Sequence, residues 1–261
     1  MSTFQMPFFY FIKTVSKAEI NAWLAQAKDK AEEYFYQGNR ISAEFEPIKG
    51  WRPFAKYGTN PVEIIHNCIQ DYDNTVNKIL FCRDRFAYKT DTFHLHGKIA
   101  GFNFYNTQNP RNALILPLVI GKETSVYNIM NNPTNYPESD LVYSYQDYYN
   151  KFPPEVKQYI LNMNLPYVKA AGGLDSMQAH VFPPAICEIS HYDSLYNSTI
   201  TSAFEHIKWT IVKWAREKKA DSFWLRESCT GMGQFVWQVN KGLTRNRIDS
   251  NQALFPCFCI G

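Results

Sequence analysis

The last nine residues of the chain, ALFPCFCIG, contain no charged side chain, although chain ends normally contact water. Their apolar side chains include Phe255, Phe258 and Ile260. In an extended strand, Cys257 and Cys259 would point to one side while Phe258 and Ile260 point to the other. We therefore expect a strand with an apolar edge that docks on a neighbouring copy and a thiol edge that can be cross-linked to it.

The beginning of the chain is also apolar, with four consecutive aromatic residues, Phe8, Phe9, Tyr10 and Phe11. This run is too short to cross a bilayer and lacks the basic start of a secretory signal, so we expect an intracellular protein. We interpret residues 1–15 and 250–261 as arms of a single domain that spans residues 1–261. Both arms are suited to contacts with neighbouring copies.

Helix signals are the clearest local patterns between these arms. The capping box from Ser16 to Glu19 opens a predicted amphipathic helix over residues 16–37. Asn60 and Pro61 occupy the N-cap and first helical position of a second predicted helix. Further helices are expected from Pro153, over 199–219 and over 231–239.

Strand signals are fewer and weaker. Residues 85–106 alternate enough to predict two short strands around Gly97, and residues 113–121 form a buried run interrupted by Pro117. Residues 165–186 are interpreted as a long irregular connection. The predicted fold class is therefore mainly α: a single compact helical domain with a small β element, long loops and extended N- and C-terminal arms.

The composition favours contact surfaces. The chain has 19 Phe, 17 Tyr and 6 Trp, and aromatic residues are enriched at protein interfaces. An aromatic-rich core would explain the same numbers. The net charge is only +3, but basic residues exceed acidic ones between Lys208 and Arg247, where Trp209, Trp214, Trp224 and Trp237 are interleaved. That stretch suits nucleic acid, or the solvated face of a helix.

A search for catalytic chemistry finds little. His94 and His96 could face one metal ion from an extended segment, but no third ligand stands at a diagnostic spacing. Cys187 lies near His191, and Cys229 precedes two glycines, yet spacing alone cannot place a base beside either thiol. We expect no enzyme activity, no cofactor and no metal. The alternative is a hydrolase that depends on a metal or a cysteine and uses His94, His96 or Cys187.

The six cysteines include no CxxC pair, which argues against zinc-ribbon and thioredoxin-like sites. In a reducing compartment, buried free thiols are the default. Disulfides between copies would have to form after assembly. The candidates for such a contact are Cys257, Cys259, Cys229 and Cys82.

A tyrosine cluster, Tyr143, Tyr145, Tyr148 and Tyr149, lies in sequence beside two aspartates. Tyrosine, lysine and cysteine change charge between about pH 8 and 11, so contacts built from them would repel one another as the pH rises. We interpret this cluster as alkali-sensitive. The tyrosines could equally pack against a helix.

In overall character the chain resembles the viral occlusion-body proteins, or polyhedrins, which crystallise inside infected insect cells and encase virions. The resemblance rests on the aromatic-rich arms, the tyrosine cluster and the scattered cysteines. The helical, disulfide-linked nudivirus polyhedrins are the relatives that it implies. It implies a non-enzymatic matrix protein of the infected host cell, in the nucleus for a nudivirus, that is released in occlusion bodies and dissolves in alkali.

The partners implied by this resemblance are copies of the chain itself, with virions as cargo. No membrane partner is expected, and nucleic acid is a secondary alternative. A viral nucleic-acid-binding protein would use the basic stretch from Lys208 to Arg247.

Overall fold

A computed structural model of the 261-residue chain provides the fold. The residues that it describes are 12–14, 45–47, 56–82, 84–90, 93–104, 111–117, 123–130, 134–186, 222–229, 231–232, 234–239 and 243–261. The predicted helices over 16–37 and 199–219 and the aromatic residues Phe8 to Phe11 lie outside these residues.

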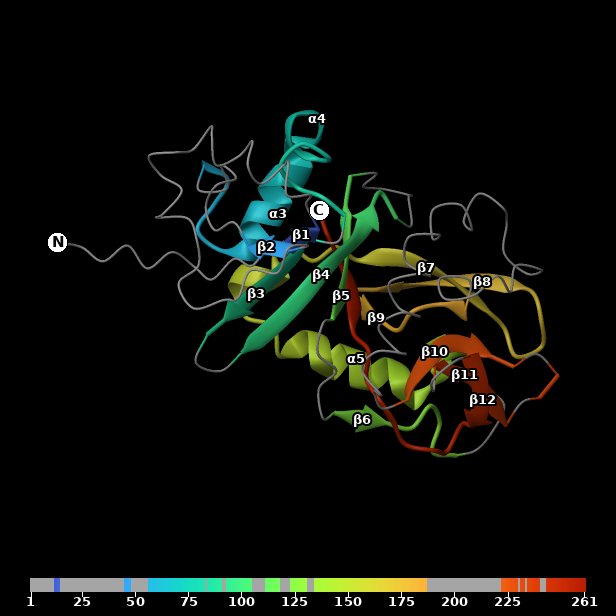
Figure 1. Ribbon diagram of the computed structural model, residues 1–261. Coiled ribbons are helices and arrows are strands. Elements are labelled where there is room, and N and C mark those ends of the chain that lie inside the picture. The colour runs from blue at the N-terminus through green and yellow to red at the C-terminus, as the bar shows by residue number, and fades with distance from the viewer. Residues whose placement is uncertain are drawn as a thin grey trace.

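The described part of the chain is mainly β, so the predicted mainly α, helical fold class is wrong (Figure 1). One five-stranded sheet has the strand order β3-β4-β5-β14-β9. Its strands are β3 (Arg85–Lys89), β4 (His94–Phe102), β5 (Ala113–Pro117), β14 (Cys257–Ile260) and β9 (Val181–Phe182). All of its neighbouring strands run antiparallel.

A second five-stranded sheet has the order β12-β11-β10-β13-β6. Its strands are β12 (Leu243–Arg247), β11 (Phe235–Val239), β10 (Phe223–Ser228), β13 (Gln252–Ala253) and β6 (Thr124–Ser125). The strand pairs β7 (Met163–Val168) with β8 (Leu174–Ala179), and β1 (Ile12–Thr14) with β2 (Phe45–Pro47), are separate two-stranded sheets.

The described helices are short. They are α3 (Pro61–Gln70), α4 (Tyr72–Thr75), α5 (Asp140–Asn150) and α6 (Pro154–Lys157), with a 3₁₀ turn, η2 (Tyr136–Glu138). The start of α3 is as predicted, because the Asn60 side chain accepts a hydrogen bond from the Glu63 N–H at 2.9 Å. No helix in the described ranges is long and apolar enough to span a membrane.

Two predictions in the C-terminal half are wrong because long-range pairing decides the structure there. Residues 231–239 were expected to be helical, but Phe235–Val239 forms strand β11 and pairs with β12 over five residues. Residues 165–186 were expected to be irregular, but they contain parts of β7 and all of β8 and β9. Some of the strands that pair in these sheets are distant in sequence, so local sequence patterns predict them poorly.

The strands predicted around Gly97 exist, but Gly97 lies inside β4 rather than between the two strands. A Cβ atom at this position would lie 2.5 Å from the Phe86 ring. Glycine is therefore required for close packing between β3 and β4, not for a turn.

The predicted C-terminal arm is an internal strand of the same chain. β14 lies between β5 and β9, and Phe255, Phe258 and Ile260 are buried. The Phe258 ring packs edge-on against Phe152, with centroids 5.3 Å apart, while the Phe255 ring stacks on Phe223 at 4.4 Å. These apolar side chains are covered by the chain's own core, so they present no docking edge to a neighbouring copy.

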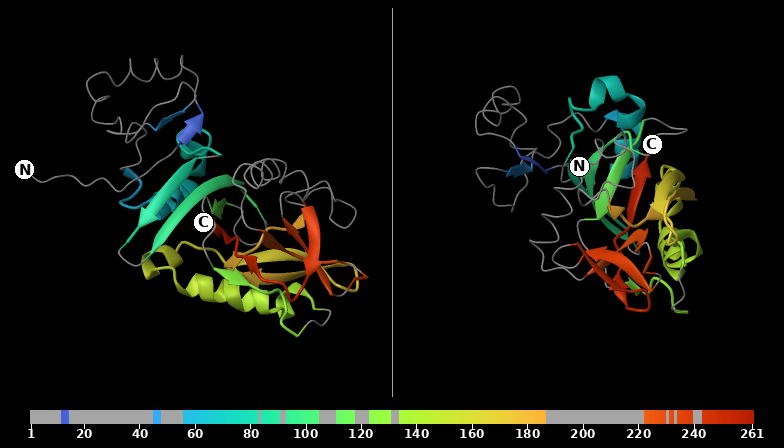
Figure 2. Two further views of the ribbon diagram at one scale, coloured as in Figure 1. Left: turned by 60° about the horizontal axis from the view of Figure 1, so that its bottom comes forward. Right: turned by 90° about the vertical axis from the view of Figure 1, so that its right-hand side faces the viewer.

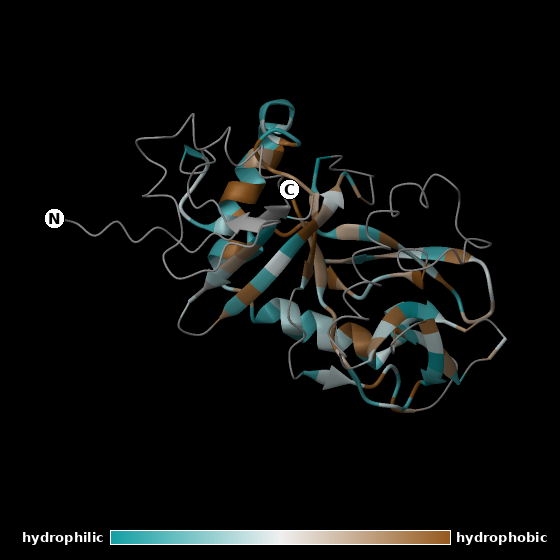
Figure 3. Ribbon diagram, in the orientation of Figure 1, coloured by the Kyte–Doolittle hydropathy of each residue, from teal (hydrophilic) through white to brown (hydrophobic). Residues whose placement is uncertain are grey.

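Helix α5 lies along the sheets with one side turned outward, as both views of Figure 2 show. It contacts β9 and β6. Apolar residues gather on α3 and on the central strands, whereas much of α5 is polar (Figure 3). This helix therefore separates buried structure on one side from solvent on the other.

Candidate functional site

The four tyrosines of the predicted alkali-sensitive cluster all belong to α5, but they do not share one environment. Tyr143 is 69% exposed, whereas Tyr145 is 1% exposed. Tyr148 and Tyr149 are half-buried. A helix turns about 100° per residue, so neighbouring tyrosines reach both the core and the solvent. The cluster is thus divided between the two sides of α5.

Burial changes the acidity of the inward-facing tyrosines. It raises the pKa of Tyr148 to about 12 and that of Tyr145 well above its ordinary value. The pKa of Tyr136, on the adjacent turn η2, is also raised well above its ordinary value by burial. These hydroxyls therefore remain neutral in the folded protein at pH values that ionise an exposed tyrosine.

The outward side of α5 borders an exposed apolar surface, the 129–143 patch, made of Ile129, Met130 and Tyr143. Ile129 and Met130 are each 71% exposed. The Asp140 carboxylate accepts a hydrogen bond from the Ile129 N–H at 2.7 Å, which holds this turn beside the first turn of α5. Tyr143 lies three residues further along the helix, on the same side as Asp140.

The inward side of α5 borders a pocket of about 220 Å³. The pocket combines side chains from η2, α5, the segment before β7, and the β8–β9 region. Its lining residues are Tyr136, Val142, Tyr145, Gln146, Asn162, Met177, Gln178, Ala179, His180 and Val181. None of these residues is an aspartate, glutamate, lysine or arginine.

Two buried tyrosines, Tyr136 and Tyr145, line this pocket. The Tyr145 hydroxyl accepts a hydrogen bond from the Phe255 N–H at 3.1 Å, which leaves its own proton to donate. Tyr136 is 1% exposed, and no described residue forms a hydrogen bond with its hydroxyl. A buried polar group without a protein partner is uncommon and points to a ligand or solvent contact.

The remaining polar groups of the pocket are amides and a histidine. Asn162 donates to the Gln178 side-chain oxygen at 3.0 Å. The His180 ring stacks on Tyr149 with centroids 4.3 Å apart, and burial lowers the pKa of His180. The imidazole is therefore neutral at pH 7 and has one donor and one acceptor nitrogen.

The cysteines proposed for cross-links between copies are mostly inside the protein. Cys257, Cys259 and Cys229 are buried, and Cys82 is partly exposed. Burial raises the pKa of Cys229 to about 11. No disulfide joins the cysteines that the structure describes, so the predicted disulfide-linked character is corrected. Enclosed thiols with raised pKa values exchange slowly with partners outside the chain.

The residues of the hydrolase alternative are not brought together. His94 and His96 are exposed on one side of β4, as alternation predicts. Within the described ranges, no group of three or more His, Cys, Asp or Glu side chains is placed to hold a metal ion. Cys187 and His191 lie outside those ranges.

The basic, tryptophan-containing stretch is divided between core and surface. Trp224 and Arg226 are fully buried, and the Arg226 guanidinium donates to the Pro183 carbonyl at 2.7 Å. Trp237 is half-buried, and the Arg245 guanidinium lies 4.6 Å from its ring centroid. The described part of this stretch is therefore not one helix face, and Trp209 and Trp214 lie outside it.

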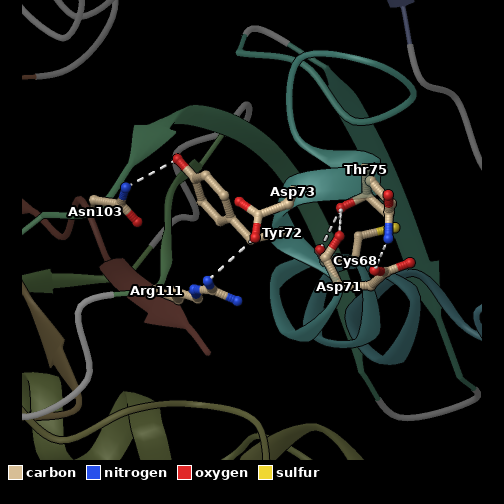
Figure 4. Close-up of polar contacts among 8 residues, drawn as sticks. Cys68, Asp71, Tyr72, Asp73, Thr75, Asn103 and Arg111 are labelled. Carbon is tan, nitrogen blue, oxygen red and sulfur yellow. Dashed lines mark hydrogen bonds and ion pairs between the residues drawn. The ribbon is translucent and has the colours of Figure 1, made fainter.

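A polar junction joins α3 and α4 to the ends of β4 and β5 (Figure 4). Asn103 donates to the Tyr72 hydroxyl at 2.9 Å, and Arg111 approaches Asp73 at 3.5 Å. The Thr75 hydroxyl donates to the Cys68 and Asp71 carbonyls. These contacts satisfy one another and tie the helices to the sheet, so we interpret the junction as structural.

The pocket was missed by sequence reasoning. Its polar side chains come from separate segments, and Gln146, Asn162 and Gln178 form no local motif. Tyr136 lies in a segment rich in Pro and Asn, NNPTNYPESD, which contains no binding motif. Only the packing of α5 against the β7–β9 region brings these groups together.

Comparison with known proteins gives a family but no named relative. A family model described as "Domain of unknown function (DUF6273)" matches residues 110–261. No curated protein and no solved structure matched the chain. The matched range includes α5, both surfaces beside it and the C-terminal strand. Because the match covers more than half of the 261 residues, the chain belongs to the family described as Domain of unknown function (DUF6273).

Proposed function

We propose that this chain is a non-enzymatic structural protein that associates with copies of itself through the 129–143 patch. The observation that supports this proposal is the exposure of Ile129 and Met130, at 71% each, and of Tyr143. Tyr143 follows one helical turn after Asp140, the residue that binds the Ile129 N–H. Burying such side chains contributes roughly 25 cal/mol per Å² of apolar surface removed from water. Methionine and tyrosine are also enriched in protein interfaces.

A second copy is the partner that the composition favours. The protein has a net charge of only +3, so electrostatic repulsion between copies is weak. The patch is apolar and bordered by the Asp140 carboxylate, which already accepts a hydrogen bond from Ile129. An apolar centre with a polar rim is the usual anatomy of an interface between proteins.

The finer form of this proposal is a dense matrix that dissolves in alkali. The C-terminal strand cannot link its copies, because its apolar side chains lie in the core of one chain. Alkali would act instead on the buried tyrosines, whose neutral form the fold requires. Ionising them would open each chain and release it from the matrix.

Sedimentation velocity of the full chain at pH 7, from low micromolar to several hundred micromolar, tests the association. The variant carries Met130→Ser and Ile129→Ser, two exposed positions whose change should not affect folding. We expect the wild-type sedimentation coefficient to rise with concentration and that of the variant to stay constant.

A matched control carries Met232→Ser and Phe235→Ser, which removes exposed apolar side chains elsewhere on the surface. It should associate like the wild type. A wild-type chain that stays monomeric over the whole range, or a patch variant that associates as well as wild type, would refute the proposal.

Nucleic-acid binding is a second candidate, favoured by the stacking of Arg245 on Trp237 at the outer side of the β11–β12 hairpin. Such arginine and aromatic surfaces contact phosphates and bases of single strands. Binding of a fluorescent single-stranded oligonucleotide that weakens with salt and with Arg245→Ala would support it. Equal retention of the oligonucleotide by the Arg245→Ala variant would exclude this surface.

A further inference from the structure

We propose that the pocket between α5 and the β7–β9 region binds a single uncharged sugar ring. The juxtaposition that carries this inference is a buried, unpaired tyrosine hydroxyl beside a lining of amides, a histidine and apolar side chains. It is independent of the proposed self-association, which concerns Ile129, Met130 and Tyr143, because none of these residues lines the pocket.

One hydroxyl in the pocket lining has no protein hydrogen-bond partner among the described residues. Leaving a hydroxyl buried without a hydrogen bond costs about 1–3 kcal/mol. The Tyr136 side chain is 1% exposed and its hydroxyl has no partner among the described residues. The Tyr136 oxygen also keeps a small accessible surface, so protein atoms do not enclose it completely. A ligand hydroxyl in the pocket would supply the missing hydrogen bond.

Beside Tyr136, the Tyr145 side chain also lines the pocket. Its hydroxyl accepts a hydrogen bond from the Phe255 N–H, which holds this side chain in place. A tyrosine hydroxyl both donates and accepts, as does each hydroxyl of a sugar. The Tyr136 hydroxyl therefore complements a hydroxyl on a sugar ring.

The lining excludes charged ligands. None of its ten residues carries a formal charge at pH 7, since His180 is neutral there. A carboxylate, phosphate or ammonium group placed in this pocket would lose its water without gaining a counter-ion, at a cost of several kcal/mol. An uncharged ligand avoids that cost.

The remaining lining suits a ring with both polar edges and apolar faces. Gln146, Gln178 and Asn162 supply amide donors and acceptors around the opening. Val142, Met177 and Val181 supply apolar contact for C–H groups. At about 220 Å³ the pocket is smaller than the roughly 300–1,000 Å³ of pockets for drug-sized ligands, which favours one ring over a larger molecule.

The experiment is ligand-observed NMR and isothermal titration of the full chain with D-glucose, D-galactose and N-acetyl-D-glucosamine. D-Glucuronate and D-glucosamine are charged controls of almost the same shape. We expect at least one neutral sugar to bind and both charged analogues to bind at least tenfold more weakly. Absence of binding by all three neutral sugars at tens of millimolar, or equal binding of the charged analogues, would overturn the proposal.

The diagnostic variant is Tyr136→Phe, which removes the unpaired hydroxyl and keeps the ring. It should fold normally, because no protein hydrogen bond is lost, and should bind the neutral sugar about tenfold more weakly. Tyr148→Phe removes a hydroxyl from α5 outside the pocket lining and should bind like wild type. If Tyr136→Phe binds sugar as tightly as wild type, solvent satisfies this hydroxyl and the site is not the one proposed.

Discussion

The two sides of helix α5 differ in what they present. Toward solvent, the 129–143 patch shows apolar side chains with little hydrogen-bonding capacity. Toward the β7–β9 region, the pocket combines buried hydroxyls, amides and a neutral histidine. An exposed apolar patch fits another protein surface, whereas a pocket with an uncharged polar lining fits a small ligand. Under the two proposals, one helix contributes to two different binding surfaces.

This difference predicts unequal stability effects for two tyrosines on one helix. Tyr145→Ala removes a fully buried ring and should lower the free energy of unfolding by about 3–5 kcal/mol. Tyr143→Ala changes an exposed ring and should alter it by less than about 0.5 kcal/mol. Urea denaturation monitored by circular dichroism measures both. Similar losses for the two variants would show that α5 is not oriented as described.

Alkali should destabilise the chain through its inward-facing tyrosines. Their folded pKa values lie above the unfolded value of about 10, so the unfolded state releases protons first as the pH rises. The stabilisation is complete below about pH 10 and falls by about 1.4 kcal/mol per pH unit for each such group above it. Urea denaturation at pH 7 to 11 measures this loss.

Tyr145→Phe provides the matched test of that pH dependence. This variant lacks one buried phenol. The slope of the free energy of unfolding against pH above pH 10 should therefore decrease by the contribution of about one proton. An identical slope in wild type and Tyr145→Phe would assign the alkaline sensitivity to other groups.

The smallest expected difference is in stability at pH 7, between variants that lose the hydroxyl of Tyr145 or of Tyr136, the two tyrosines that line the pocket. Tyr145→Phe removes the buried hydroxyl that accepts from the Phe255 N–H and should cost about 1–3 kcal/mol. Tyr136→Phe breaks no protein hydrogen bond and should change stability by less than about 0.5 kcal/mol. Thermal denaturation of both variants checks this order. A large loss in Tyr136→Phe would reveal a partner for its hydroxyl.

Local signals in the sequence predicted some elements correctly. The N-cap at Asn60 and the proline at Pro61 predicted the start of α3. Alternation predicted two strands within residues 85–106, although Gly97 lies inside β4 rather than between the strands. These features depend on neighbours within a few residues. These features can therefore be predicted from the local sequence alone.

Other features depend on partners far away in sequence. The apolar C-terminal segment was expected to cover a neighbouring copy, yet β14 pairs with β5, more than a hundred residues earlier. The sequence of an apolar segment indicates that the segment is buried, but it does not indicate which part of the protein buries it. The pocket was invisible for the same reason, since η2, α5 and β8 contribute its lining from separate segments.

Hydroxyl-radical footprinting of Met130 and Met177 tests the two-sided account most directly, because these methionines report on the patch and the pocket. Oxidation is measured by mass spectrometry at low and high protein concentration, with and without saturating neutral sugar. We predict that protein concentration protects Met130 but not Met177, and that the sugar protects Met177 but not Met130. Oxidation rates that ignore both variables, or that change together at both methionines, would contradict the account.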